Sequence, residues 1–207
     1  GLELTAEEAL EIGGSLGLSV ADVVYASASF SLSRSAASGI DDPDEATSQT
    51  LSGQMLSVSI SQATLFIGTG ASLDTDSESE TFGAVSLPAS DDPTAVGFYV
   101  AEGSLDLAIF TATSTLKEST QTTLTTPRKY TGLQAGLGRA GLQGIEAVEL
   151  IATGLSVKLN KTSVVDDTTT PTVTEGQLLD WSALDTDELG LELTAEEALE
   201  IGGSLGL

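Results

Sequence analysis

The sequence predicts an all-β fold: an elongated, glycine-punctuated β-sheet module with long acidic and threonine-rich loops, repeated in tandem. Apolar and polar residues alternate over long stretches, which is the side-chain period of a β-strand. Glycines recur within the apolar stretches, as they do at bulges and corners of curved sheets. Residues 1–18 also recur letter for letter as residues 190–207. A β-rod, a solenoid-like stack and a sandwich all fit these observations.

The duplication predicts the domain organisation. Position 190 repeats position 1, so the period of the array is 190 − 1 = 189 residues. We therefore expect residues 1–189 to form one complete β-rich unit and residues 190–207 to begin the next one. Arrays that repeat one module supply length, surface or valency more often than a single catalytic centre.

The first strand candidate is unusually long, because the even positions from Leu2 to Leu32 are mostly apolar. A straight strand of about 31 residues would reach about 100 Å, against a diameter of about 40 Å for a compact globule. Either the module is elongated or the chain turns back through a loop that preserves the alternation. A three-residue loop such as Gly13-Gly14-Ser15 would preserve it. Residues 5–11 also fit a capping box, which leaves a short helix as the alternative there.

Further strands follow along the chain. Residues 54–67 alternate with a phase slip near Gln62, as a bulge would give. The other strand candidates are residues 95–112, 130–138, 145–153 and 154–161, with two helical turns as the alternative over 145–152. Polar composition predicts four long loops, at residues 34–52, 72–94, 111–129 and 162–176.

Composition restricts the partners. The chain has 31 acidic and 7 basic residues, a formal charge of −24, and 40% hydrophobic residues. The hydrophobic content argues against disorder, and the negative field repels nucleic acid and anionic membrane surfaces. No apolar run is long enough for a transmembrane helix, so we expect no membrane insertion in this segment. The absence of cysteine excludes disulfides and thiolate metal sites.

Three short motifs resemble functional sites. Residues 13–17 match the G-x-S-x-G nucleophile elbow, which needs a histidine base that this sequence lacks. Residues 136–141 match G-x-G-x-x-G, but no acidic residue follows at the distance of a ribose ligand. We therefore expect no enzyme. Residues 160–162 form an N-glycosylation sequon.

Two acidic clusters are candidate calcium sites; we expect no other cofactor. Carboxylates at alternate positions are typical of the start of a calcium loop. In the first cluster, however, Ser79 stands where an EF-hand has glycine and Val85 where it has a bidentate glutamate. The alternative is a solvated acidic loop. The candidate ligands are Asp74, Asp76, Glu78 and Glu80 in one cluster, and Asp180, Asp185, Asp187 and Glu188 in the other.

The junction between units contains no flexible linker. Residues 178–189 run into the repeated string without proline or a glycine-serine stretch, so neighbouring units should be in contact. Trp181, the only tryptophan, is expected to be a core or junction anchor. The expected inter-unit residues are Leu2, Leu4, Leu10, Ile12, Leu16, Leu18, Trp181, Leu191, Leu193, Leu199 and Ile201.

Glycine-punctuated strands, serine and threonine richness, acidity, absent cysteine and an exact long repeat together make the chain resemble giant tandem-repeat bacterial surface and secreted proteins, the large adhesin and extracellular fibre class. The resemblance implies an extracellular or cell-surface location and neighbouring copies of the repeat as partners. It also implies a structural role in a fibre or adhesin stalk, often with calcium, although the glycine-aspartate nonapeptide of well-known calcium repeats is missing. The alternative is an adhesive module whose acidic loops bind a glycan, an ion or a protein.

Overall fold

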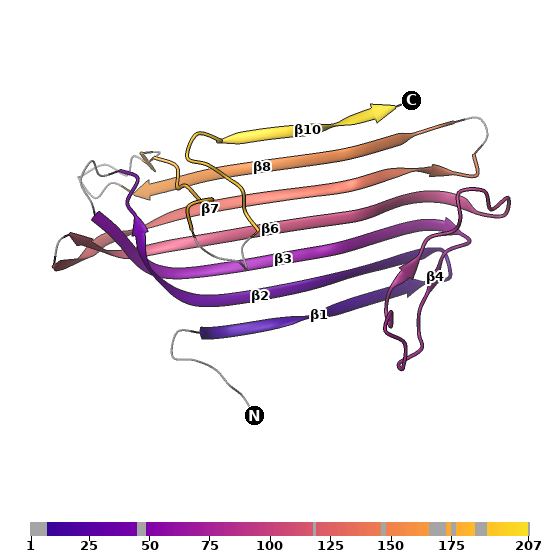
Figure 1. Cartoon of the computed structure of the whole chain (residues 1–207), viewed down its shortest axis with the longest axis horizontal. Coiled ribbons are helices and arrows are strands. Elements are labelled where there is room, and N and C mark those ends of the chain that lie inside the picture. Colours follow the sequence, from indigo (N-terminus) through magenta and orange to yellow (C-terminus); the bar gives the residue numbers. More distant parts are fainter. Residues whose placement is uncertain are drawn as a thin grey trace.

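Seven long strands form one open antiparallel sheet in the computed structural model of the chain (Figure 1). The structure describes residues 8–44, 49–117, 119–145, 148–165, 173–174, 177–184 and 190–206. In sheet order the strands are β1 (Glu8–Val20), β2 (Val24–Asp41), β3 (Gln49–Thr69), β6 (Val96–Lys117), β7 (Thr120–Gln143), β8 (Ile151–Val165) and β10 (Leu199–Gly206). Two short strands, β4 (Ser72–Leu73) and β5 (Val85–Ser86), form a separate pair, and β9 (Val173–Thr174) pairs with β8. The all-β prediction is confirmed, since the described residues contain no helix.

The long alternation at the start of the chain is a hairpin. Val20 lies opposite Val24, so residues 21–23 form a three-residue connection between β1 and β2. Ala21 and Asp22 have φ values of 52° and 53°, and the Val23 amide donates to the Val20 carbonyl at 3.1 Å. Because paired residues share a face, even-numbered positions stay on one face across the turn. The expected loop therefore lies at 21–23, whereas residues 13–15 are inside β1.

A line of bulges crosses the sheet. Gln62 in β3, Glu102 in β6 and Gly154 in β8 have φ values of 54°, 58° and 59°. The strand registers place these three irregular positions close to one another across neighbouring strands. Each irregularity shifts the inward and outward alternation by one residue. The predicted phase slip near Gln62 is confirmed.

Several predicted boundaries are wrong. Two of the expected loops, 34–52 and 111–129, are largely strand, because β2 runs to Asp41, β3 begins at Gln49, and only two residues separate β6 from β7. Threonine and serine suit exposed strand positions as well as loops, and composition alone does not separate the two.

The prediction for the start of β8 also fails. Residues 145 and 148–150 have no regular structure, so neither the expected strand nor the helical alternative forms there, and β8 begins at Ile151. Part of the expected loop 162–176 belongs to β8 and β9; residues 166–172 and 175–176 lie outside the described residues. The helical alternative at 5–11 is wrong for residues 8–11, which begin β1, while residues 5–7 also lie outside. The loop expected at 72–94 is confirmed apart from the two-residue strands β4 and β5.

One face of the sheet is apolar across all seven strands. Cross-strand partners share a face, so the registers define rows of side chains that run from β1 to β10. We call the surface made by these rows the apolar face. Three of its rows are Ile12, Leu32, Val58, Leu107, Leu133, Leu159 and Leu199; Gly14, Phe30, Ile60, Leu105, Ala135, Val157 and Ile201; and Leu18, Ala26, Leu65, Val100, Ala140, Ala152 and Leu205.

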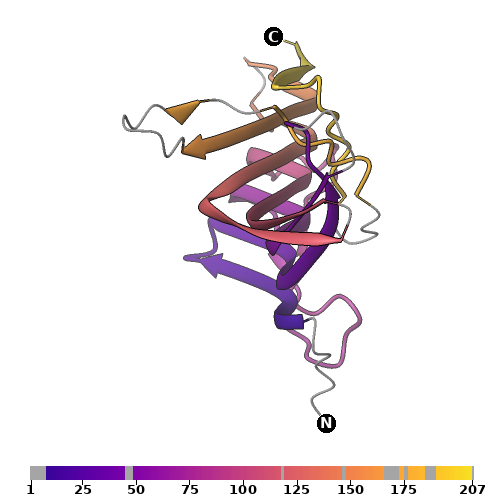
Figure 2. The same cartoon turned by 90° about the vertical axis from the view of Figure 1, so that its left-hand side faces the viewer.

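The opposite face carries the buried core; we call it the covered face. Figure 2 shows two segments on this side of the sheet. One segment, within residues 177–194, buries Trp181 against residues of β3, β6 and β7 that include Phe110 and Tyr130. The other, which contains β4 and β5, packs on Tyr25 and Phe66 at the opposite end of the strands. Between them lies a hollow whose lining on this face consists of Glu11, Ser31, Ser33, Ser57 and Ser59.

Candidate functional site

The two copies of the duplicated string form the two edges of the sheet. Residues 10–17 lie within β1, and their copy, residues 199–206, is β10. β1 pairs with β2 at one edge, and β10 pairs with β8 at the other (Figure 1). The same eight residues therefore have β2 as a neighbour in one copy and β8 in the other.

The two edge strands run in the same direction. Five strands, β2, β3, β6, β7 and β8, separate them in an antiparallel series, so the direction reverses an even number of times between β1 and β10. Their arrows point the same way in Figure 1. One copy can therefore be superposed on the other without reversing the direction of the strand.

The registers relate the two copies by a shift of two residues. The row that starts at Ile12 in β1 ends at Leu199 in β10, and Leu199 is the copy of residue 199 − 189 = 10. The row that starts at Leu18 ends at Leu205, the copy of Leu16. A shift of two corresponds to about 7 Å along the strand. Because the shift is even, the string keeps its apolar side chains on the same face at both edges.

A buried asparagine holds the second copy against β8. Asn160 is 2% exposed; its Nδ2 donates to the Leu179 carbonyl at 2.8 Å and to the Thr194 carbonyl at 3.0 Å. Its Oδ1 accepts from Trp181 Nε1 at 3.0 Å, and its backbone amide donates to the Ala198 carbonyl at 3.0 Å. Both the nitrogen and the oxygen of the side-chain amide are therefore hydrogen-bonded. This environment does not suit glycosylation, which needs an exposed asparagine.

The beginning of the second copy is part of the hydrophobic core. Leu191 and Leu193 are buried with Trp181, and the Trp181 amide donates to the Leu193 carbonyl at 2.9 Å. The expected inter-unit residues thus divide into two groups. Those in the edge strands (Leu10, Ile12, Leu16, Leu18, Leu199 and Ile201) are exposed on the apolar face, while Trp181, Leu191 and Leu193 are buried under the covered face. Leu2 and Leu4 lie outside the described residues.

The first acidic cluster is organised by hydrogen bonds within its own loop. The Asp76 amide donates to Asp74 Oδ1 at 3.0 Å, and the Glu78 amide to Asp76 Oδ1 at 3.0 Å. Thr81 Oγ1 donates to Asp74 Oδ2 at 2.7 Å. The hydroxyls of Thr81 and then Ser79, together with the Asp76 amide, lower the pKa of Asp74. Both oxygens of that carboxylate are therefore used locally, and Glu80 is exposed.

The second acidic cluster is only partly described. Asp180 Oδ1 accepts from Ser182 Oγ at 2.6 Å and from the Ala183 amide at 3.3 Å. Asp185, Asp187 and Glu188 lie outside the described residues. Within the described part of the chain, no group of three or more acidic side chains is arranged to hold a metal ion.

An ion pair that the sequence does not reveal lies just after the end of β2. Asp42 is 5% exposed, and Arg128 Nη1 lies 2.8 Å from both of its carboxylate oxygens. Gln49 Nε2 donates to Asp42 Oδ2 at 3.2 Å. Nearby, burial raises the pKa of Tyr130 to about 12. Asp42 and Arg128 are 86 residues apart, and no local pattern links them.

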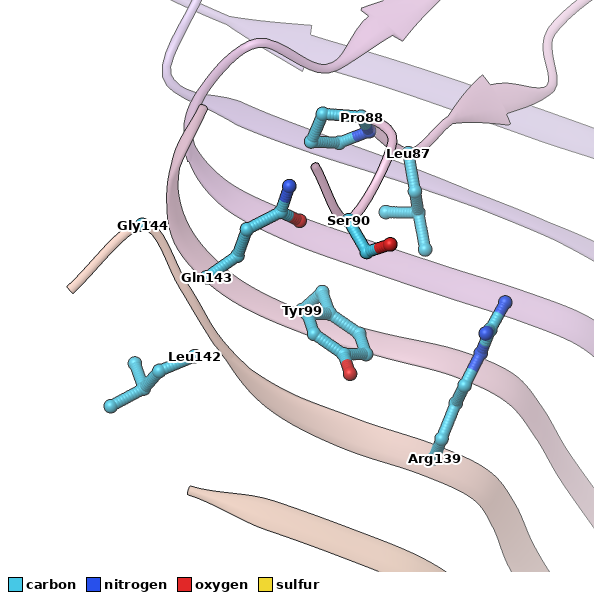
Figure 3. A pocket seen from close by; sticks show the side chains of 8 residues that line it. All are labelled: Leu87, Pro88, Ser90, Tyr99, Arg139, Leu142, Gln143 and Gly144. Carbon is cyan, nitrogen blue, oxygen red and sulfur yellow. The ribbon is translucent and has the colours of Figure 1, made fainter. Parts of the chain in front are cut away.

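The short motifs are not in the structural context that they need, and a separate hollow lies on the covered face. Residues 13–17 and 136–141 lie within β1 and β7, not at the strand-to-helix turns that both motifs need. A hollow of about 350 Å³ on the covered face is lined by Leu87, Pro88, Ser90, Tyr99, Arg139, Leu142, Gln143 and Gly144 (Figure 3). Arg139 is the charged group in this lining, and its Nε lies 3.8 Å from Glu102 Oε1.

The described residues include no helix with the length and apolarity needed to cross a bilayer. In comparisons with known proteins, no protein-family model, curated protein or solved structure matches the chain.

Proposed function

We propose that the chain is a structural repeat of a long extracellular fibre or adhesin stalk, in which one β-sheet continues from each unit into the next. The observation that carries the proposal is the position of the duplicated string, whose two copies occupy the two edges of the same sheet. The net charge of −24 and the absence of cysteine suit an exposed, soluble surface outside the cell.

Strand sharing explains why both copies are present. A β-strand has two hydrogen-bonding edges, and an edge strand leaves one of them unpaired. If the string at each junction is a single strand, it pairs with β8 of the preceding unit and with β2 of its own unit. The parallel direction of β1 and β10 and the even register shift are the two conditions that such sharing requires. Both edges are then satisfied at every junction.

The segment before the shared strand supports a fixed junction. Trp181, Leu191 and Leu193 bury the connection against the covered face, and Asn160 binds it at both ends. A connection held in this way transmits orientation from one unit to the next, unlike a flexible linker.

A two-unit chain, residues 1–189 followed by residues 1–207, tests the proposal. Gly202 lies opposite Ser156, and its counterpart Gly13 lies opposite Ser31. Strand sharing therefore places Ser156 of the first unit and Ser31 of the second two strand spacings apart, about 10 Å. With cysteines at these positions in this cysteine-free chain, we expect efficient cross-linking by a short bismaleimide.

The matched control places both cysteines in one unit. Ser31 and Ser156 of the same unit are separated by about four strand spacings, or about 20 Å, so the same reagent should not join them. Equal cross-linking of the two pairs, or none between units, would show that the sheet does not continue across the junction.

A further inference from the structure

Neither buried cluster of the described structure lies on the apolar face. Both buried clusters lie on the covered face, and large side chains of the apolar face remain open to solvent: Phe30 is 40% exposed, Ile67 44% and Ile201 72%. Monomeric soluble proteins rarely expose apolar patches larger than a few hundred Å². We infer that this face packs against the apolar face of a second copy, giving a two-layered assembly. The inference goes beyond strand sharing because it concerns a face and not the edges.

The area of the face matches a stable interface. Seven strands span six spacings of about 4.8 Å, or about 29 Å. The rows from Leu32 to Val24 span eight residue steps, or about 26 Å, along the strands. Two such faces would remove about 1,500 Å² from water, within the usual range of stable protein–protein interfaces, about 1,200–2,000 Å². Two twisted sheets can pack in this way about 10 Å apart, with aligned strands.

The charges on and around the face favour a second copy. Between the rows of Val24 and Ala36, the paired positions on this face carry no acidic residue. Glu102, at the bulge of β6, has its Oε1 3.8 Å from Arg139 Nε, and most of the negative charge of the chain lies elsewhere. Repulsion between two copies therefore does not act within the contact itself. Such a face can bury its apolar side chains against an identical one.

The distribution of charge also selects an orientation. Arg34, Lys129 and Lys161 are exposed basic residues of the apolar face, all at the end of the strands remote from the β1–β2 turn. Exposed acidic residues lie at both ends of the strands: Asp22 and Glu149 in connections at the turn end, and Asp41 and Asp44 at and just after the end of β2. A two-fold axis that lies in the plane between the two faces, perpendicular to the strands, turns the faces toward each other and keeps the basic side chains of one copy away from those of the other. We therefore assign the antiparallel arrangement.

Sedimentation equilibrium of the 207-residue chain tests the inference. We expect a reversible dimer that Phe30→Ser weakens at least about tenfold, because the substitution occurs twice in a two-fold interface. Phe82→Ser is the matched control, since Phe82 is 56% exposed in the loop segment of the covered face. Lys161→Glu should weaken the dimer more than Lys158→Glu, because Lys158 lies on the covered face. Circular dichroism confirms that each variant retains its strands.

Three outcomes would overturn the inference. The chain could stay monomeric at tens of micromolar. Association could persist unchanged in Phe30→Ser, which would locate the contact at the sheet edges and leave strand sharing intact. Alternatively, the chain could bind phosphatidylcholine vesicles through Phe30 without self-association, which would identify the face as a lipid-binding surface. The cross-linking of the two-unit chain is independent of all three results.

Discussion

At the residue scale, the structure depends on a few positions where backbone and side chain meet closely. The indole of Trp181 lies on Gly132 in β7. A Cβ atom added at Gly132 would lie 2.8 Å from the ring atoms Cε2 and Nε1. Asn160, opposite Gly132 in β8, binds the indole nitrogen. These two small or polar residues shape the site that receives Trp181, and neither has a sequence pattern that marks it.

A pair of glycine substitutions measures the Trp181 contact. We expect Gly132→Ala to lower the free energy of unfolding by about 3 kcal/mol, because the added methyl displaces the indole from a packed core. Gly136→Ala, in the same strand, should change it by less than about 1 kcal/mol, since the nearest atom, the Leu155 carbonyl oxygen, is 3.4 Å from the built Cβ. Urea denaturation followed by tryptophan fluorescence gives both values. Similar losses for the two variants would contradict the packing described here.

At the element scale, β10 protects an edge that would otherwise be open. It covers β8 with a copy of the sequence that forms β1. The buried leucines Leu191 and Leu193 precede it, so β10 can be removed without removing the core segment. The free side of β1 then becomes the natural partner for β8 of another molecule.

Deletion of residues 199–207 should therefore produce head-to-tail assembly. We expect the chain ending at Ala198 to form oligomers that grow with concentration, because the interface joins two different edges and does not close on itself. A peptide with the sequence of residues 190–207 should reverse the growth by occupying β8, and Gly13→Pro should prevent it by blocking the edge of β1. Sedimentation velocity distinguishes these outcomes. A truncated chain that sediments like the 207-residue chain would argue against an active β8 edge.

At the scale of the whole molecule, strand sharing defines the geometry of a long array. Each unit contributes six long strands, β1, β2, β3, β6, β7 and β8, before the next copy of the string begins. The strands then lie across the direction of growth. The two-residue shift per unit adds a displacement of about 7 Å along the strands, so successive units step sideways as the sheet extends.

Fibre diffraction from an aligned multi-unit array tests this geometry. We expect a reflection at about 4.8 Å along the fibre axis and an axial repeat of about 29 Å, six strand spacings per unit. Units stacked end to end along their strands would instead place the 4.8 Å spacing across the axis. In that case the axial repeat would approach the length of the longest strands, about 70–80 Å.

The sequence by itself determined the local properties of the chain: its all-β class, the two-residue alternation, the phase slip at Gln62 and the identity of the two end strings. These are local because side-chain alternation depends only on neighbouring residues. It did not distinguish loops from exposed strands at 34–52 and 111–129, where serine and threonine serve both.

Only the tertiary structure decided which strands are neighbours, that the two copies occupy opposite edges in the same direction, and that Trp181 and the apolar rows lie on different faces. Pairing and register join residues far apart in the chain, such as Asp42 and Arg128. They depend on backbone hydrogen bonds and packing that no short stretch of sequence contains.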